Sequence, residues 1–97
     1  SDNITSNNDF IKTRYNVSAP YPNPATNTAY FDVQTNTNDV LDYKIIDLSG
    51  RVLSSGKTQL RQGKNKVSVD VSGLKAGMYH VAFNGNQIKT SKKLIIQ

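Results

Sequence analysis

The chain contains no cysteine and no glutamate, and its single histidine is His80. Without cysteine there can be no disulfide, no thiolate metal site and no thiol nucleophile. Acid–base catalysis would depend on aspartates in predicted loops and turns, and His80 falls at an outward position of a predicted strand. The six glycines are scattered and form no phosphate-binding loop. We therefore expect no enzyme and no bound cofactor or metal.

Long hydrophobic runs are also missing. The longest wholly apolar run near either end covers residues 94–96, far short of the ~20 residues that cross a bilayer. We expect no transmembrane segment. The only methionine is Met78 and no signal-peptide pattern is present, so we expect one domain from a longer protein.

The net charge of +5 is unevenly distributed. Residues 1–50 carry three basic and six acidic groups, whereas residues 51–97 carry nine basic groups and one acid, Asp70. This asymmetry could attract acidic partners, phosphate-bearing lipids or nucleic acid. However, only Lys92 and Lys93 are adjacent, and no basic run is interleaved with aromatics. We favour lysines on strand exteriors and expect no nucleic-acid partner.

Alternation of apolar and polar residues predicts β-strands along most of the chain. No stretch shows a sustained helical period. We predict strands at residues 15–19, 28–34, 40–48, 51–60 and 66–71, and two more within 77–97. Residues 51–60 could form one long strand or two shorter ones, because Gly56 can act as a bulge between them. About seven short strands predict an all-β, two-sheet antiparallel sandwich, with a barrel as the lesser alternative.

Residues 77–97 are predicted to form a closing hairpin. Asn84-Gly85 favours the positive backbone angles of a two-residue type I′ turn. Such a turn would pair Val81 with Ile88 and Tyr79 with Thr90. One face of the hairpin would then be apolar and would need a second sheet to cover it. Its members are Tyr79, Val81, Phe83, Ile88, Leu94 and Ile96.

Two segments before the first long strand lack alternation. Residues 1–13 are polar and asparagine-rich, and we expect a linker or disordered lead-in before a domain at residues 14–97. Pro20, Pro22 and Pro24 follow closely on one another, and each lacks an amide donor. They predict an extended corner at a sheet edge.

The remaining connections are predicted turns. In residues 47–50, the Asp47 side chain is expected to hydrogen-bond the turn backbone while Gly50 accommodates a positive φ. Residues 62–65 predict another turn, and residues 72–77 a single helical turn that buries Leu74. Asp39, Asp42 and Asp47 could together hold calcium, but their spacing fits no dense acidic loop, so turn or surface roles are favoured.

Four motifs remain: residues 21–25 (YPNPA), 47–51 (DLSGR), 74–79 (LKAGMY) and 92–97 (KKLIIQ). Their order, spacing and position against the C-terminus resemble the C-terminal sorting domain of the type IX (Por) secretion system of Gram-negative bacteria. The resemblance extends from about residue 17 to the last residue.

The resemblance implies an immunoglobulin-like sandwich at the tail of a larger exported protein. Such a domain directs its upstream cargo from the periplasm through the outer membrane to the cell surface or the medium. The implied partners are the type IX translocon, shuttle and sortase proteins, and the sortase typically removes the domain.

The resemblance also identifies candidate site residues. Family-motif positions expected to be structural are Pro22, Asn23, Pro24, Asp47, Gly50, Arg51, Gly77 and Tyr79. Positions expected to contact a partner are Lys92, Lys93, Leu94, Ile95, Ile96 and Gln97. A free edge of this last strand could pair with a partner's backbone, while its lysines discriminate among surfaces electrostatically.

Two other classes of function remain open. A carbohydrate- or surface-binding module should display a row of exposed aromatics, of which Tyr30 is the best outward candidate in the sequence. A purely structural spacer domain predicts that shortening the C-terminus affects stability alone.

Overall fold

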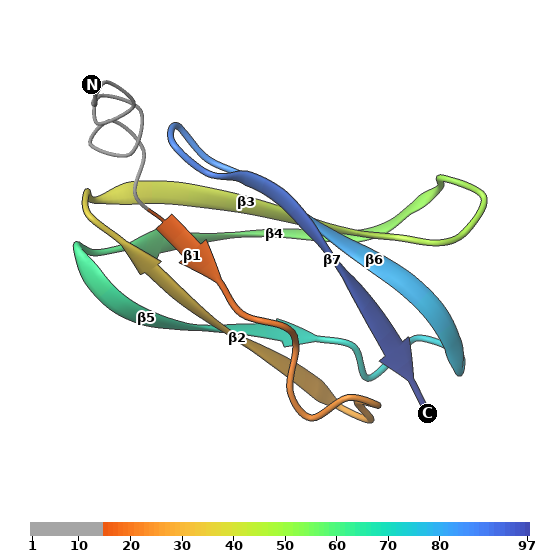
Figure 1. The fold of residues 1–97 in the computed structure, drawn as a ribbon. Coiled ribbons are helices and arrows are strands. Elements are labelled where there is room, and N and C mark those ends of the chain that lie inside the picture. Colours follow the sequence, from red (N-terminus) through yellow and green to blue (C-terminus); the bar gives the residue numbers. More distant parts are fainter. Residues whose placement is uncertain (1–14) are drawn as a thin grey trace, which may run out of the picture.

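The computed structural model describes residues 15–97, so the expected lead-in at residues 1–13 lies outside the described part. The described chain forms seven β-strands and no helix (Figure 1). They are β1 (Tyr15–Val17), β2 (Thr28–Thr35), β3 (Asp39–Ile46), β4 (Val52–Leu60), β5 (Gly63–Asp70), β6 (Gly77–Asn84) and β7 (Lys89–Ile96). The all-β prediction is confirmed.

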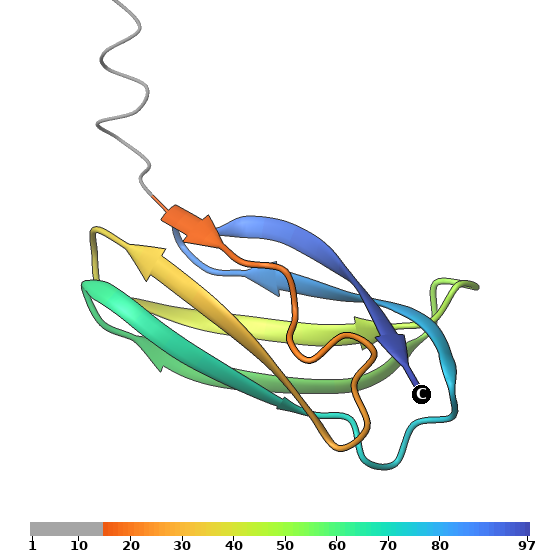
Figure 2. The same ribbon diagram turned by 60° about the horizontal axis from the view of Figure 1, so that its bottom comes forward.

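The strands form two sheets that pack face to face, as Figures 1 and 2 show from two directions. One sheet has the order β1-β2-β5 and the other β4-β3-β6-β7, with every pairing antiparallel. The chain crosses between sheets after β2, β4 and β5, as in immunoglobulin-like domains. The molecule is therefore a sandwich and not a barrel.

The core lies between the sheets and is built from the alternate residues that the sequence pattern predicted. Phe31 of β2 and Phe83 of β6 meet edge to face, with ring centroids 4.9 Å apart. Such a pair adds about 0.5–1.5 kcal/mol beyond the burial of its area. The predicted inward residues of β2, β5 and the closing hairpin are all buried: Ala29, Phe31, Val33, Val67, Val69, Tyr79, Val81, Phe83, Ile88, Leu94 and Ile96.

The closing hairpin exists, but its predicted register is wrong. Val81 pairs with Lys92 rather than Ile88, and Tyr79 pairs with Leu94 rather than Thr90. The connection is longer than two residues, and the amide of Gly85 donates to the carbonyl of Ile88 at 2.7 Å. Each partner lies four residues further along than predicted. Because four is even, the same side chains remain on the buried face.

Gly85 is required for a different reason from the one the sequence suggested. Its φ is not positive, unlike those of Gly50, Gly63 and Gly77. A Cβ on Gly85 would lie 2.7 Å from Oδ2 of Asp39. The glycine therefore permits the close approach of a buried carboxylate to the loop.

The bulge predicted at Gly56 is also misplaced. The register of β3 with β4 shifts between Ile45 and Ile46, at the outer end of the ribbon. Gly56 pairs regularly with Tyr43, whose ring lies directly over it. The glycine therefore provides space for an aromatic ring instead of bending the strand.

Two predicted connections differ from the structure. Residues 72–77 contain no helical turn; the amide of Leu74 donates to the carbonyl of Val71 in a β-turn, and Leu74 packs against the core only partly buried. The turn expected at residues 62–65 is shorter, because β5 already begins at Gly63. The Asn65 side chain accepts from the Arg61 amide at 3.0 Å and stabilises this tight crossing between sheets.

Candidate recognition site

The last strand lies between β6 and the proline segment, so three of the four motifs meet at one end of the sandwich. Ile96 pairs with Gly77 on β6 and, on its other side, forms a parallel bridge with Ala25. Figure 1 shows the C-terminus at this end, beside the start of β6. The predicted site residues at 22–24, 77–79 and 92–97 are thus brought together by the fold.

Hydrogen bonds close the outer edge of β7 at its C-terminal end. The Ile95 amide donates to Oδ1 of Asn23 at 3.1 Å, and the Ile95 carbonyl accepts from the amide of Ala25 at 2.8 Å. The Gln97 amide donates to the carbonyl of Ala25 at 2.9 Å. Pro22 and Pro24 flank this contact and are exposed. The proline motif therefore covers part of the edge that the sequence predicted to be free.

The rest of the β7 edge is short. At its start, the hydroxyl of Tyr15 donates to the carbonyl of Lys89 at 3.1 Å. Backbone groups alternate in direction along an edge strand, so Ser91 and Lys93 point theirs outward like Ile95. Among residues 15–97, no hydrogen bond reaches these outward groups. The free edge is limited to two residues.

The side chains of β7 alternate between the core and the outer face. Leu94 and Ile96 are buried, whereas Lys93 and Ile95 lie on the outer face, where Ile95 is 36% exposed. Lys92 is half-buried on the inner side of the strand. The two adjacent lysines therefore point to opposite faces and form no common positive patch. Of the six predicted contact residues, two belong to the core.

The central motif builds the tip of the β3–β4 ribbon. Oδ1 of Asp47 accepts from the amide of Ser49 at 2.9 Å, its hydroxyl at 2.6 Å and the amide of Arg51 at 3.0 Å. Oδ2 of Asp47 lies 3.3 Å from Nε of Arg51, and Gly50 has φ +91°. The Ser49 hydroxyl, assisted by the Arg51 amide and its charge, lowers the pKa of Asp47. The turn prediction is confirmed.

Tyr79 also has a structural role. Its ring is almost fully buried, and its hydroxyl donates to the carbonyl of Lys75 at 2.6 Å. This bond ties the β5–β6 connection to β6. Gly77, the other residue of the glycine-x-tyrosine element, opens the strand and pairs with Ile96.

Asp39 is a structural residue that the sequence did not reveal. It was expected in a loop or on the surface, yet it is 5% exposed at the start of β3. Burial opposes its ionisation, but the amides of Asn86, Gln87 and Val40 donate to its carboxylate at 2.8–3.1 Å and lower its pKa overall. Nothing in the local sequence predicts these partners, two of which lie in the β6–β7 connection, 47 and 48 residues further along the chain.

The calcium alternative finds no support in the described part of the chain. Asp39, Asp42 and Asp47 are spread along β3 and the turn after it, and no three potential ligands come together within residues 15–97. No helix of the described residues could span a membrane.

A model of one protein family matches residues 19–97, and its description is a secretion system C-terminal sorting domain. The chain belongs to this family. Membership indicates a sorting signal for type IX secretion and export to the cell surface or beyond.

The fold of this sorting domain has a relative among solved structures. It is similar to part of dimeric latent PorU from Porphyromonas gingivalis, with a TM-score of 0.61 and 19% identity. The match covers 84% of the present chain and 9% of the PorU chain, so the sorting domain spans about a tenth of that protein. At this identity the likeness concerns the fold alone. No curated protein matches the sorting domain in sequence.

The carbohydrate-binding alternative requires a row of exposed aromatic side chains, and the described residues provide one aromatic pair. Tyr21 packs against Tyr30 on the three-stranded sheet, with ring centroids 5.8 Å apart and a 32° tilt. The Tyr21 hydroxyl donates to Asp32 at 2.6 Å, and Nζ of Lys66 lies 4.4 Å from the centre of the Tyr30 ring. The ring faces are thus engaged within the sorting domain. A sugar would have to displace these contacts.

Proposed function

We propose that this domain is a non-catalytic signal that directs an upstream cargo protein from the periplasm across the outer membrane. The type IX translocon and its shuttle proteins bind the domain, and a sortase then removes it. The family match over residues 19–97 carries this proposal. The meeting of the proline, glycine-x-tyrosine and C-terminal motifs at one end of the sandwich supports it.

The recognition surface that we propose is the outer side of β7 around Lys93, Ile95 and Gln97. These side chains are exposed, whereas Leu94 and Ile96 are committed to the core. Ser91 and Lys93 add free backbone groups at the edge. The exposed side chains on the outer face of β7 are Lys89, Ser91, Lys93 and Ile95. A partner that binds the end of this strand therefore meets Lys93 beside an apolar side chain, and not the adjacent pair Lys92 and Lys93.

Export of a reporter fused in front of the full chain tests the proposal. We expect secretion only in cells with an intact type IX system. Deleting residues 92–97 would be uninformative, because it removes Leu94 and Ile96 from the core. The sharper variants are Lys93→Glu and Ile95→Ser on the outer face, with Ser68→Glu on the exposed face of the other sheet as the matched control.

The two surface variants should reduce export while the thermal unfolding of the purified domain stays unchanged. The Ser68→Glu variant should be exported like the unmodified fusion. Export that does not depend on the type IX system would refute the sorting function. Mass spectrometry of the surface product should show a reporter that has lost residues 15–97, because a sortase cut before β1 leaves no part of the sandwich attached.

A further inference from the structure

Strand β4 leaves a whole edge of the four-stranded sheet without a partner. It is nine residues long and pairs only with β3. Within residues 15–97, no hydrogen bond from outside β3 reaches its backbone. By contrast, β7 is closed at both ends and β1 has only three residues. Such an open edge is a template for an additional strand.

The direction of the β4 backbone groups follows from the pairing registers. Ile95 directs its amide and carbonyl away from β6, so its neighbours in β7 bond to β6. The observed pairings of β6 with β3 and of β3 with β4 extend the same alternation to β4. The backbone amides and carbonyls of Ser55, Lys57 and Gln59 therefore point away from the sheet. The edge therefore presents three amides and three carbonyls in a row.

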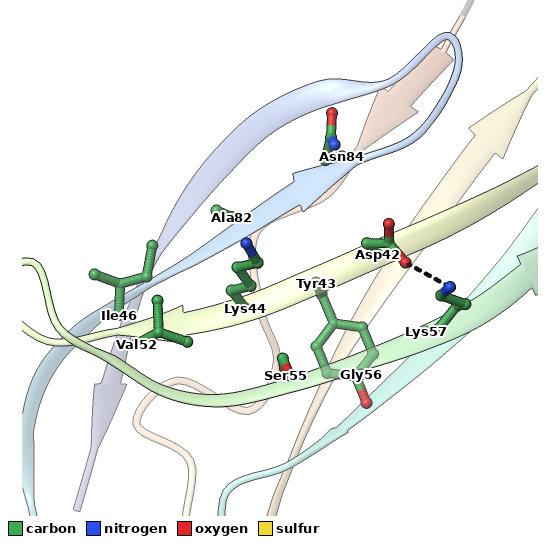
Figure 3. Close-up of a pocket in the computed structure, with 10 residues that line it drawn as sticks. All are labelled: Asp42, Tyr43, Lys44, Ile46, Val52, Ser55, Gly56, Lys57, Ala82 and Asn84. Atoms are coloured by element: carbon green, nitrogen blue, oxygen red, sulfur yellow. Dashed lines mark ion pairs between the residues drawn. The ribbon is translucent and has the colours of Figure 1, made fainter.

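A shallow hollow of about 650 Å³ lies beside this edge on the outer face of the sheet. Figure 3 shows Ile46 and Val52 at one end of it, with Lys44 in the middle. Asp42 and Lys57, whose charged atoms are 3.7 Å apart, lie at the other end. Val52 is 50% exposed, although it belongs to a strand. Alternate side chains of an added strand would lie over this hollow.

The charge around the edge selects the kind of strand that fits. Residues 51–61 contain three cations and no carboxylate. Arg51 and Lys57 have ion-pair partners in Asp47 and Asp42, whereas Arg61 has none within the described chain. Lys44 has no ion-pair partner within the described chain, and the small side chain of Ser55 pairs beside it. If a second copy of the domain paired through its own β4, the cations of the two copies would lie close together and repel each other. An acidic segment would complement them.

The open edge of β5 fits an added strand less well. Its outward residues Lys64 and Lys66 are also cationic, but Lys66 is already engaged over the Tyr30 ring. No exposed large apolar side chain lies on β5.

We infer that β4 is a strand-addition site for an extended segment of a partner protein that carries carboxylates at alternate positions. The segment bonds to Ser55, Lys57 and Gln59 through its backbone and places its carboxylates near Lys57 and Lys44. The place of this contact in export rests on the proposed sorting function. The existence of the edge site does not.

Binding to the purified chain tests the site directly. The probe is an acetylated peptide of alternating glutamate and valine, about eight residues long like the strands it would join. A peptide of alternating lysine and valine is its control. We expect the acidic peptide to shift the backbone amide resonances of Ser55, Lys57 and Gln59, and the basic peptide to leave them unchanged.

Substitutions locate the bound peptide. Lys57→Pro removes an outward amide, which an edge strand tolerates, and should weaken binding about tenfold or more. Ser68→Pro is the matched control on β5, because its partner Tyr30 bonds Tyr21 and so the Ser68 amide also points outward. If the proline variant fails to fold, the double variant Lys44→Glu and Lys57→Glu replaces it. The double variant Lys64→Glu and Lys75→Glu, which makes the same change of charge away from β4, is then the control.

Three results would overturn the inference: no shift at β4, equal shifts with the basic peptide, or binding that survives the β4 variants. A dimer of the free chain that Lys57→Pro dissociates would also contradict it, by showing that a second copy takes the edge. Export separates the two proposals. If β4 variants are exported normally by the type IX system, the edge has no part in sorting and the sorting function stands.

Discussion

The amide of Ala25 donates a hydrogen bond of 2.8 Å to the carbonyl of Ile95 and joins the proline segment to the last strand. Ala25 is fully buried, and its carbonyl accepts from Gln97 in turn. Two motifs at opposite ends of the family match are therefore one structural unit. A partner that pairs with the end of β7 must first displace this segment.

Replacing Asn23 with alanine should loosen that unit. The variant loses the bond from the Ile95 amide to Oδ1, which costs about 1 kcal/mol or less for an exposed neutral pair. Amide hydrogen exchange at Ile95 should become faster, while exchange in the core of β6 stays unchanged. Asn23→Asp keeps an acceptor and should protect Ile95. Equal exchange in all three proteins would contradict the assignment.

Leu94 and Ile95 are adjacent and should respond differently to truncation. Leu94 is fully buried, so Leu94→Ala should lower the free energy of unfolding by about 2–5 kcal/mol. Ile95 is on the outer face, and Ile95→Ala should cost less than about 1 kcal/mol. Denaturant unfolding of the two variants provides the comparison. Similar losses would show that β7 does not sit in the sandwich as described.

Gly85 and Gly73 form a matched pair for testing close packing. A Cβ on Gly85 would lie 2.7 Å from Asp39 Oδ2 and 3.2 Å from the carbonyl oxygen of Val40, whereas a Cβ on Gly73 meets nothing within 4 Å. Gly85→Ala should therefore destabilise the domain by about 1–3 kcal/mol, as other overpacked sites do. Gly73→Ala should be close to neutral. Thermal unfolding of the two variants is the measurement. Equal unfolding temperatures for Gly85→Ala and Gly73→Ala would contradict close packing at Gly85.

Asp39 should contribute stability that depends on pH. At neutral pH, Asp39→Asn should cost about 2 kcal/mol, because an amide donor replaces a charged acceptor that faces three backbone amides. The pKa of Asp39 is lowered in the folded state, so the unfolded chain binds its proton first as pH falls. The contribution of Asp39 is thus complete above the ordinary aspartate pKa of about 4 and is lost below it.

The measurement is the free energy of unfolding of both proteins between neutral and acidic pH. The gap between them should be constant at neutral pH and narrow below pH about 4. A gap that stays constant in acid would show that the Asp39 carboxylate has no special environment. Asp42→Asn, at a half-buried carboxylate of the same strand that accepts no backbone amide, is the control and should show a much smaller gap.

The strands and their inward faces could be predicted from the sequence because alternation is a local property. In β2 and in the second half of β5, apolar residues recur at every second position, and each of those side chains is buried: Ala29, Phe31, Val33, Val67 and Val69. The turn at Asp47 and Gly50 could also be predicted, because its hydrogen bonds all join residues within four positions of one another.

The register of the closing hairpin could not be predicted from the sequence in the same way. A shift of four residues leaves the same face apolar, so alternation cannot separate the predicted pairing from the observed one. The deciding contact is the Asp39 carboxylate, which accepts hydrogen bonds from the amides of Asn86 and Gln87 in the loop. Asp39 lies 47 and 48 residues before them in the chain, so the local sequence does not show this contact.

The amino-acid sequence by itself determined that this chain forms about seven strands, most of them with one apolar face, and its four motifs indicated the family. Only the tertiary structure decided which edges are open. The edge of β7 is closed at Ile95 by Ala25, while the edge of β4 stays unpaired. The reason is physical: backbone amides and carbonyls are the same in every residue, so side-chain patterns cannot show which of them find partners across the fold.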